Sequence, residues 1–149
     1  MRAVVQRVRE ARVRVDGLVV GEIGHGIVAL IGVAKDDGPE DVAYLAPKIR
    51  ELRLFDDGDG RMNLGLAEVG GAILAVSQIT LYGDCRRGRR PSFDRAAAAE
   101  NGRVLFDALV LELQHAGVPV ATGTYQAHMA VELVNDGPVT ILFDSRREF

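Results

Sequence analysis

The sequence is poor in the residues that build metal sites and covalent cross-links. Cys85 is the only cysteine among 149 residues, which excludes an internal disulfide and any cysteine-rich metal site. The histidines, His25, His115 and His128, are too scattered to form a helical or hairpin pair of zinc ligands. We therefore expect neither a metal nor another cofactor.

Long apolar runs are absent as well. No run approaches the roughly 20 residues that a membrane-spanning helix needs, and the opening MRAVVQR is too polar to begin a secretory signal. A cytoplasmic protein without a membrane partner is expected. The net charge of -3 argues against indiscriminate nucleic-acid binding, so DNA is not an expected partner, although a local basic patch can still steer a polyanion.

Motifs of common catalytic and nucleotide-binding sites are also missing. Ser77 lacks the G-x-S-x-G turn that exposes a hydrolase serine, and Cys85 lies among arginines without an obvious base. Gly24 and Gly26 fit a dinucleotide-binding spacing, but they lead into an apolar strand instead of opening a helix. The residues alone therefore offer no conventional nucleophile.

Enough apolar sequence is present for one globular domain over residues 1–149. Hydrophobic residues make up 48% of the chain and charged residues 26%. Apolar patterns predict strands at residues 4–15, 18–20, 27–33, 72–82 and 122–134, and one at 139–143 that completes a hairpin with the strand before it. Asp16-Gly17 predicts a two-residue hairpin turn.

Two main helices are predicted beside these strands. The first begins at Pro39, and Pro47 predicts a kink or a division into two short helices. The second covers residues 96–116, begins nearer Gly102 if Asn101-Gly102 weakens its first turns, and ends at Gly117. Together the patterns indicate an α+β fold that is strand-rich, with mostly antiparallel sheets or a barrel-like core.

Three polar residues interrupt the strand predicted at residues 72–82. Ser77, Gln78 and Thr80 would each be costly to bury without a hydrogen-bond partner. They must either form internal hydrogen bonds or line a cavity, and both possibilities remain open.

A basic loop follows, with Arg86, Arg87, Arg89 and Arg90 close together. A charge run is most often a solvated surface. In a chain of net negative charge, this one is also the best candidate for a patch that faces phosphate groups.

Near the end of the chain, Asn135-Asp136-Gly137-Pro138-Val139-Thr140 forms a polar turn between two apolar runs. Gly137 has no Cβ and Pro138 has a fixed φ, so the pair can bring bare backbone close to a small substrate. On its own the motif is most often a turn between strands, and the sequence does not determine the isomer of the Gly-Pro bond.

Four segments together resemble the D-aminoacyl-tRNA deacylases. They are Gln6-Arg7-Val8, Ser77-Gln78-Ile79-Thr80-Leu81, Arg90-Pro91-Ser92-Phe93 and Asn135 to Thr140, in consistent order from Met1 to about Phe143. Ile79 is a departure, because the family commonly has phenylalanine there. The tail, residues 144–149, extends beyond the common core.

The resemblance implies a homodimer with two active sites at the subunit interface. Such an enzyme hydrolyses the ester between a D-amino acid, or glycine, and the 3′ end of tRNA. A cis Gly137-Pro138 reaches into the partner's site as a wall of backbone that leaves no room for an L side chain, which gives chiral proofreading. Arg7 braces this dipeptide.

The resemblance also implies where catalysis takes place. Thr80 is the family's traditional catalytic candidate, with Ser77 and Gln78 beside it. Either its hydroxyl attacks the ester, or the ribose 2′-hydroxyl of the terminal adenosine positions water while main-chain N–H groups near Ile79 and Thr80 hold the oxyanion. We favour the second, because it explains why no conventional catalytic group is present.

Further residues are assigned by position in the family. Phe93, Tyr125, Ala127 and Met129 match residues that line the substrate pocket, although the last three also fit a plain core strand. The arginine loop is a possible tRNA contact. Two alternatives remain: a non-catalytic tRNA-binding module that uses this loop, and a general esterase with Thr80 as nucleophile.

Overall fold

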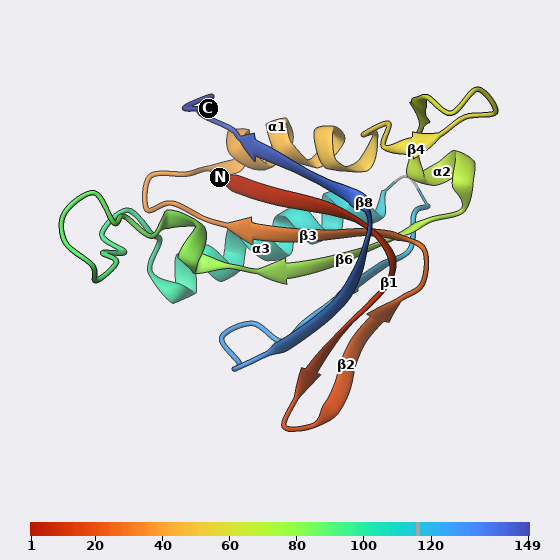
Figure 1. The fold of residues 1–149 in the computed structure, drawn as a ribbon. Helices are drawn as coiled ribbons and strands as arrows, with labels where there is room; N and C mark the ends of the chain where they lie inside the picture. Colours follow the sequence, from red (N-terminus) through yellow and green to blue (C-terminus); the bar gives the residue numbers. More distant parts are fainter. Residues whose placement is uncertain (116) are drawn as a thin grey trace.

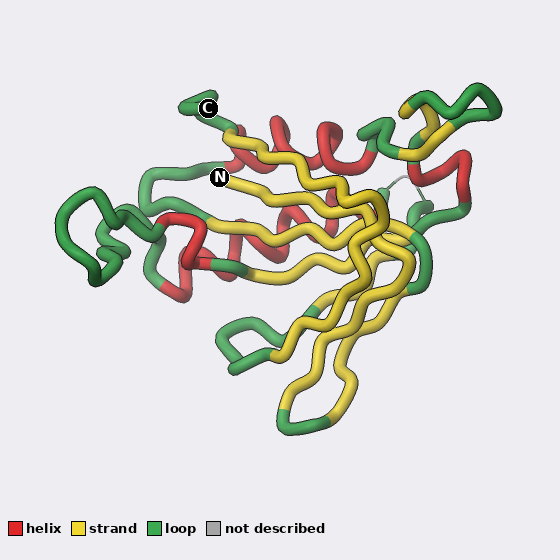
Figure 2. Tube along the Cα trace, viewed as in Figure 1, coloured by secondary structure: helices red, strands yellow, loops and turns green. Residues whose placement is uncertain are grey.

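The computed structural model describes residues 1–115 and 117–149 as one α+β unit in which strands predominate (Figures 1 and 2). In chain order the elements are β1 (Arg2–Val15), β2 (Leu18–Ile23), β3 (Gly26–Gly32), α1 (Pro39–Arg50), β4 (Phe55–Asp56), β5 (Met62–Leu64), α2 (Leu66–Val69), β6 (Ala72–Ser77), the 3-10 helix η1 (Ile79–Tyr82), α3 (Ala99–Gln114), β7 (Val120–Thr122) and β8 (Ala130–Asp144). Within these residues, no helix is long and apolar enough to cross a membrane.

A mixed six-stranded sheet organises the domain. The central strand β1 is antiparallel to β2, β3 and β8, whereas β3, β6 and β7 run parallel to one another. The predicted hairpin turn is confirmed, since Asp16 and Gly17 both have positive φ, 49° and 79°. The expectation of a strand-rich α+β fold is confirmed, with parallel pairs added on one side of the sheet.

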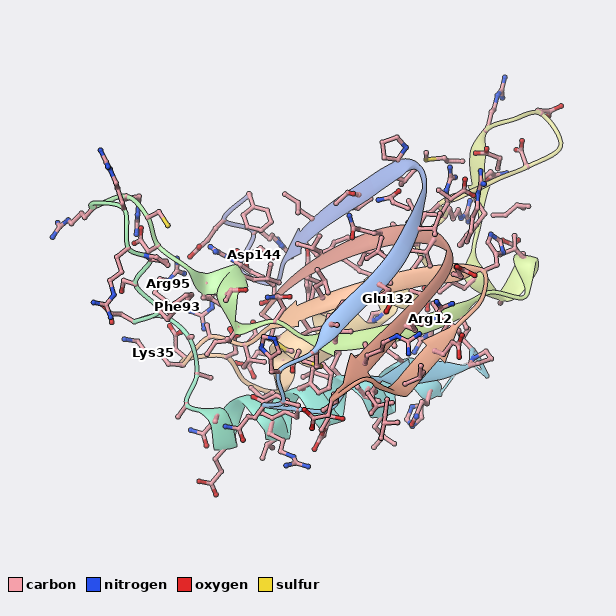
Figure 3. All side chains as sticks on the ribbon, turned by 60° about the horizontal axis from the view of Figure 1, so that its bottom comes forward. Arg12, Lys35, Phe93, Arg95, Glu132 and Asp144 are labelled. Carbon is pink, nitrogen blue, oxygen red and sulfur yellow. The ribbon has the colours of Figure 1, made fainter. Side chains whose placement is uncertain are left out.

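β1 is long enough to pair with two different strands along one of its edges. Its first half pairs with β3 and its second half with β2, while β8 follows its other edge throughout. Figure 3 shows Arg12 of β1 close to Glu132 of β8, where their side chains form an ion pair of 3.3 Å. The second half of β1 bends away from β3 and carries β2 with it. As a result β2 contacts β7, the strand at the other end of the sheet.

The contact between β2 and β7 is made by backbone. A Cβ built on Gly21 would lie 2.1 Å from the carbonyl oxygen of Thr122, so only glycine fits there. We expect Gly21→Ala to lower the free energy of unfolding by about 1–3 kcal/mol, because the backbone of one strand must move. Denaturant unfolding measures this, with Gly24→Ala as the matched control, since a Cβ on Gly24 meets nothing within 4 Å. Equal stabilities for the two variants would contradict the close approach.

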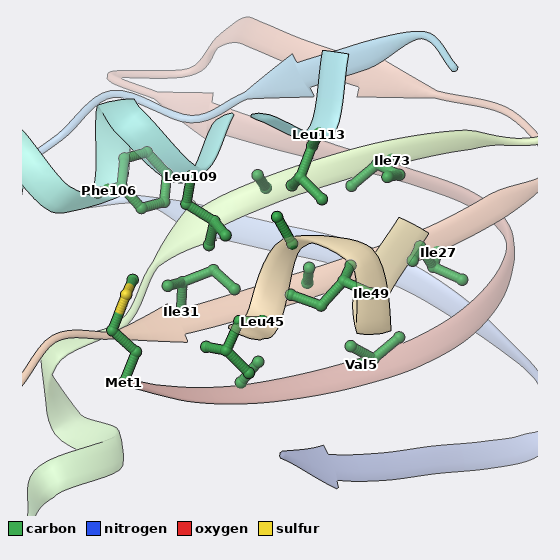
Figure 4. Packing of buried hydrophobic residues seen from close by; sticks show 14 of the residues in the cluster. Met1, Val5, Ile27, Ile31, Leu45, Ile49, Ile73, Phe106, Leu109 and Leu113 are labelled. Carbon is green, nitrogen blue, oxygen red and sulfur yellow. The ribbon is translucent and has the colours of Figure 1, made fainter. Parts of the chain in front are cut away.

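The helices α1 and α3 pack on one face of the sheet, and the side chains of β3 alternate accordingly. Ile27 and Ile31 point into the core beneath the helices, where Ile31 lies near Leu45 of α1 and Leu109 of α3, and Ile27 lies nearer Ile49 of α1 (Figure 4). Val28 points the other way, into a smaller apolar cluster beneath the curled half of the sheet. Both faces of β3 are therefore buried, as its continuous apolar run predicts.

The strand predicted at residues 72–82 is too long. β6 ends at Ser77 and the chain turns into η1, which leaves Ile79 and Thr80 exposed. The turn follows the last ladder contact, in which the Gln78 N–H donates to the Ile31 carbonyl at 2.7 Å. Apolar periodicity cannot reveal this change, because Ile79 and Leu81 continue the pattern on a helical turn.

The strand predicted at residues 122–134 and the hairpin ending at residue 143 are also wrong. β7 ends at Thr122, residues 123–129 form a loop in which Gln126 has φ 65°, and β8 is a single strand over Ala130–Asp144. Both halves of β8 pair with β1 instead of with each other. The long edge of β1 thus replaces the expected hairpin.

The helix predictions are partly right. Pro47 lies in the last turn of α1 and does not divide it into two helices. α3 begins at Ala99, before Gly102, and Gly117 has the positive φ of 74° typical of a helix end. The predicted last helical residue, Ala116, lies outside the described residues.

Candidate functional site

A cavity of about 360 Å3 opens between the end of β6, the start of α3 and the loop before β8. Its wall is apolar except at a few positions where amide and hydroxyl groups come together. The lining residues are Ile31, Val33, Ser77, Gln78, Ile79, Ala97, Ala99, Gly102, Phe106, Tyr125, Gln126, Ala127 and Met129.

This cavity brings together most of the residues that the sequence analysis assigns to catalysis and substrate binding. Ser77 and Gln78 line the cavity, and Gln78 also donates a hydrogen bond to the Thr80 hydroxyl, so both open alternatives occur in this segment. Tyr125, Ala127 and Met129 line the same cavity from the loop, so they are not part of a core strand. Thr80 and Phe93 lie outside the lining.

Gly102 and Phe106 are lining residues that the sequence analysis missed. A Cβ on Gly102 would lie 2.6 Å from the Tyr125 hydroxyl, so this glycine makes room for the ring above α3. Phe106 packs against Tyr125 with ring centroids 5.8 Å apart. The available signal was Gly102 itself, a glycine in the first turn of an otherwise good helix, which we interpreted only as a helix-weakening residue.

Backbone N–H groups without a helical partner lie at the start of η1, where Ile79 lines the cavity. The first N–H groups of a helix have no partner within it, and in η1 these belong to the exposed Ile79 and Thr80. The N–H groups on either side of this pair are both bonded. The Gln78 N–H donates to the Ile31 carbonyl, and the Leu81 N–H donates to the Gln78 carbonyl at 3.2 Å. Within residues 1–115 and 117–149, no acceptor is recorded for the Ile79 or Thr80 N–H. Both can therefore donate to a bound oxyanion.

Within residues 1–115 and 117–149, no basic side chain forms a hydrogen bond with the Thr80 hydroxyl. Its hydrogen-bond partner is the Gln78 side-chain amide, which has no basic group in either orientation. Burial, and next the charge of Asp107, raise the pKa of Tyr125, so its phenol stays protonated at neutral pH. Neither Gln78 nor Tyr125 can therefore activate a nucleophile at neutral pH.

Gly137-Pro138 is a cis peptide, and both residues are exposed where β8 bends. Arg7, itself largely buried, donates from Nε to the Asp136 carbonyl at 2.8 Å and from Nη1 to the Leu54 carbonyl at 2.5 Å. Arg7 thus contacts the carbonyl just before Gly137, and its bracing of the dipeptide stays a prediction.

Asn135 fixes the other side of this bend, a contact that the sequence analysis did not assign. Its Oδ1 accepts from the Val139 N–H at 2.8 Å and its Nδ2 donates to the Val139 carbonyl at 3.3 Å. Side-chain bonding of this type is what an asparagine just before a turn commonly provides. Together with Arg7 it holds Asp136, Gly137 and Pro138 as a rigid backbone projection.

This projection lies far from the cavity of the same chain. Arg7 pairs with Ile27 at the start of β3, whereas Ser77 pairs with Ile31 near its end. Four residues along a strand correspond to about 13 Å. Figure 1 likewise shows the bend of β8 and η1 at opposite ends of the sheet.

The predicted arginine loop extends beyond η1 and is tied at its base, where Asp84 and Ser92 exchange backbone hydrogen bonds of 2.8 and 2.9 Å. Arg86 is folded back onto Asp84, and this side-chain bond, followed by the Arg86 backbone N–H, strongly lowers the pKa of Asp84. The remaining arginines, Arg87, Arg89 and Arg90, are exposed.

Comparison with known proteins identifies the family. Residues 4–144 match the sequence model of D-Tyr-tRNA(Tyr) deacylase. Proteins named D-aminoacyl-tRNA deacylase from Anaeromyxobacter dehalogenans and Symbiobacterium thermophilum are each 57% identical over 149 residues, covering 100% of this chain and 100% and 99% of the relatives.

Solved structures share the fold. The c-Myc DNA Unwinding Element Binding Protein superposes with a TM-score of 0.91 at 34% identity, covering 97% of this chain and 98% of the other. A probable eukaryotic D-amino acid tRNA deacylase superposes with a TM-score of 0.79 at 20% identity, with 95% and 97% covered. The chain therefore belongs to the D-aminoacyl-tRNA deacylase family, whose members are ester hydrolases acting on aminoacyl-tRNA.

Proposed function

We propose that the protein hydrolyses the ester of D-aminoacyl-tRNA, and of mischarged glycyl-tRNA, releasing the amino acid and tRNA in the cytoplasm as a step of translation quality control. The observation that carries this proposal is a substrate-sized cavity lined by Ile79, at the start of η1, where the N–H groups of Ile79 and Thr80 have no hydrogen-bond partner among residues 1–115 and 117–149. Ester hydrolysis develops negative charge on the carbonyl oxygen, and donors of this type stabilise that charge.

Water is the proposed nucleophile. The 2′-hydroxyl of the terminal adenosine positions it, and the N–H groups of Ile79 and Thr80 receive the oxyanion. The Thr80 hydroxyl bonds to the Gln78 amide and, among the described residues, to no basic side chain, which supports this over attack by the hydroxyl. The ester carbon then loses the ribose 3′-oxygen, which leaves with a proton as the tRNA terminus.

Gly137-Pro138 is proposed to select chirality in the cavity of a second copy within a homodimer. The distance between this projection and the cavity of its own chain supports a site that two subunits complete. Rigid backbone facing the α-carbon tolerates hydrogen there but not a side chain, so D-amino acids and glycine enter and L-amino acids do not. Arg87, Arg89 and Arg90 are proposed to contact the tRNA backbone.

The first test compares enantiomers of one substrate. We expect the protein to release D-tyrosine from D-tyrosyl-tRNA and to leave L-tyrosyl-tRNA intact, because the backbone wall overlaps the L side chain. Release of labelled amino acid over time measures both. Equal hydrolysis of the two substrates would refute the proposal.

A second test separates the two mechanisms. We expect Thr80→Val, which keeps the side-chain shape and the backbone N–H, to retain deacylation within about tenfold, whereas loss of a covalent nucleophile costs on the order of 10^4-fold or more. Single-turnover rates on D-tyrosyl-tRNA decide between them. A collapse of the rate in a folded Thr80→Val protein would establish the hydroxyl as essential.

A further inference from the structure

The tail that follows β8 folds back across the start of β1 and reaches the end of η1. Its Glu148 carboxylate lies between two guanidinium groups, 2.7 Å from Nη2 of Arg2 and 2.6 Å from Nη2 of Arg95. Arg2 is itself held in place, because its Nη1 donates to the Leu81 carbonyl at 3.1 Å and its Nε to Asp144 at 3.2 Å. We call Arg2 and Arg95 the arginine cradle.

Aromatic rings complete the cradle. The Arg2 guanidinium carbon lies 4.7 Å from the ring centroid of Tyr82 and 5.3 Å from that of Phe149. Phe149 nevertheless remains 61% exposed, so its ring gains little from burial. The Glu148 carboxylate and the Phe149 ring thus contact a surface formed by two guanidinium groups and the Tyr82 ring.

The carboxylate in the cradle is ionised near neutral pH. The hydrogen bond from Arg95, and next that from Arg2, lower the pKa of Glu148 to about 2. The cradle therefore holds an anion near neutral pH. Its cavity of about 460 Å3 is also lined by Arg86 of the arginine loop and by Asp84, with which Arg86 is paired. The site is suited to a phosphate group, which guanidinium pairs bind with matched geometry.

The cradle adjoins the candidate active site through η1. Ile79 at one end of η1 lines the active-site cavity and Tyr82 at the other end lines the cradle. With a rise of about 2 Å per residue in a 3-10 helix, the two sites are separated by roughly 6–8 Å. A nucleic-acid strand whose terminal nucleotide enters the first site can therefore reach the second.

We propose that Arg2 and Arg95 form a subsite for a backbone phosphate of the tRNA acceptor strand, and that Glu148 and Phe149 occupy it in the free protein in place of a phosphate and a base. This rests on the proposed function, because it takes the cavity beside Ile79 as the place of the terminal adenosine. The tail remains anchored upstream when Glu148 is displaced, since Arg146 holds Asp36 at 2.8 Å and the Ser145 N–H holds the Met1 carbonyl at 2.9 Å.

The test measures binding of uncharged tRNA by fluorescence anisotropy over a range of salt concentrations. Arg95→Gln is expected to raise Kd and to make the slope of log Kd against log salt shallower by about 0.7, the value for one phosphate contact on a single strand. Glu148→Gln is expected to lower Kd by about two- to fivefold, because it removes a competitor held by a half-exposed ion pair. In the double variant the second substitution should bring no gain.

The ion pair between Arg14 and Glu132 supplies a matched control. Its distance is 2.7 Å and its side chains are 37% and 46% exposed, against 2.6 Å, 41% and 39% for Arg95 and Glu148. It lies at the distal end of β1 and β8, and Figure 3 shows Glu132 well apart from Arg95. Arg14→Gln and Glu132→Gln should leave Kd and the salt slope as in the wild type.

Three outcomes would overturn the proposed subsite. In the first, Arg95→Gln has the Kd and the salt slope of the wild type. In the second, Glu148→Gln binds tRNA no better than Glu132→Gln does, and in the third the wild type binds no tRNA. Thermal unfolding checks that each variant is folded. Because uncharged tRNA has no ester, failure of the proposed function is seen separately, as a protein that binds tRNA through Arg95 but hydrolyses no D-tyrosyl-tRNA.

Discussion

Arg7→Ala is expected to lower kcat/KM for D-tyrosyl-tRNA by about 100-fold or more, the scale of loss that follows displacement of a positioning element by about 1 Å. The side chain is largely buried and ties two separate segments together through the carbonyls of Asp136 and Leu54. Its removal leaves both carbonyls without that donor, at about 1–3 kcal/mol each. The free energy of unfolding should fall accordingly, and steady-state kinetics with denaturant unfolding measures both losses.

The neighbouring Arg9 provides the control for this substitution. It lies on the same strand and contacts the same loop through Asp136 Oδ1 at 3.3 Å, but it is 72% exposed. Arg9→Ala should therefore change activity and stability little. Arg7→Lys, which keeps the charge but has no planar fork, should fall between the two. An Arg7→Ala protein with activity like that of Arg9→Ala would show that bracing is unimportant.

The sequence predicted those parts of the fold that depend on local periodicity. Alternation in residues 4–15 predicted β1, the continuous apolar run at residues 27–33 predicted β3, and Asp16-Gly17 predicted the hairpin between β1 and β2. In β1 the buried and less buried side chains largely alternate, and in β3 nearly every side chain is buried. Such patterns show which faces of a strand are buried, and they do so without depending on which strand pairs with it.

The parts that failed depend on distant partners. Apolar residues continue the strand pattern from Ser77 to Tyr82, yet the chain turns into η1 there and exposes Ile79. Likewise Tyr125 and Met129 alternate as a strand would, but they face the cavity from a loop. Cavity-lining residues mimic a core pattern, because a site that binds an apolar group is built from the same side chains.

The candidate site was predictable only by resemblance. No spacing in the sequence indicates that Gly102, on α3, makes room for Tyr125, more than twenty residues later, or that Ile79 and Thr80 are exposed at the start of η1. Arg7 and Asp136 are 129 residues apart in the chain, and only the pairing of β1 with β8 brings them together. The motifs in the sequence therefore identify these residues, but the contacts between them follow from the strand pairing in the sheet.

Gly137→Ala is expected to lower deacylation of both D-tyrosyl-tRNA and glycyl-tRNA by about 100-fold or more. Gly137 has φ 149°, and a Cβ there would lie 2.7 Å from Val139 Cγ2 and 2.8 Å from the Val139 nitrogen. Because these atoms are fixed through Asn135, the backbone of the proposed gate must shift. Gly60→Ala tests whether positive φ alone is responsible, since Gly60 has φ 75° with nothing within 4 Å of its Cβ position. Similar losses in both variants would argue against the gate.

Mixing two inactive variants tests whether the gate acts in the partner's cavity. Ala127→Trp should fill the cavity of its own subunit, while its Gly137-Pro138 stays intact. If Gly137 acts in trans, a mixed dimer of Ala127→Trp and Gly137→Ala has one intact cavity facing one intact gate. Random reassembly of equal amounts should then restore about a quarter of wild-type activity, since half the dimers are mixed and each has one working site of two. If each gate served its own cavity, both sites of every mixed dimer would carry a defect, and no activity would return.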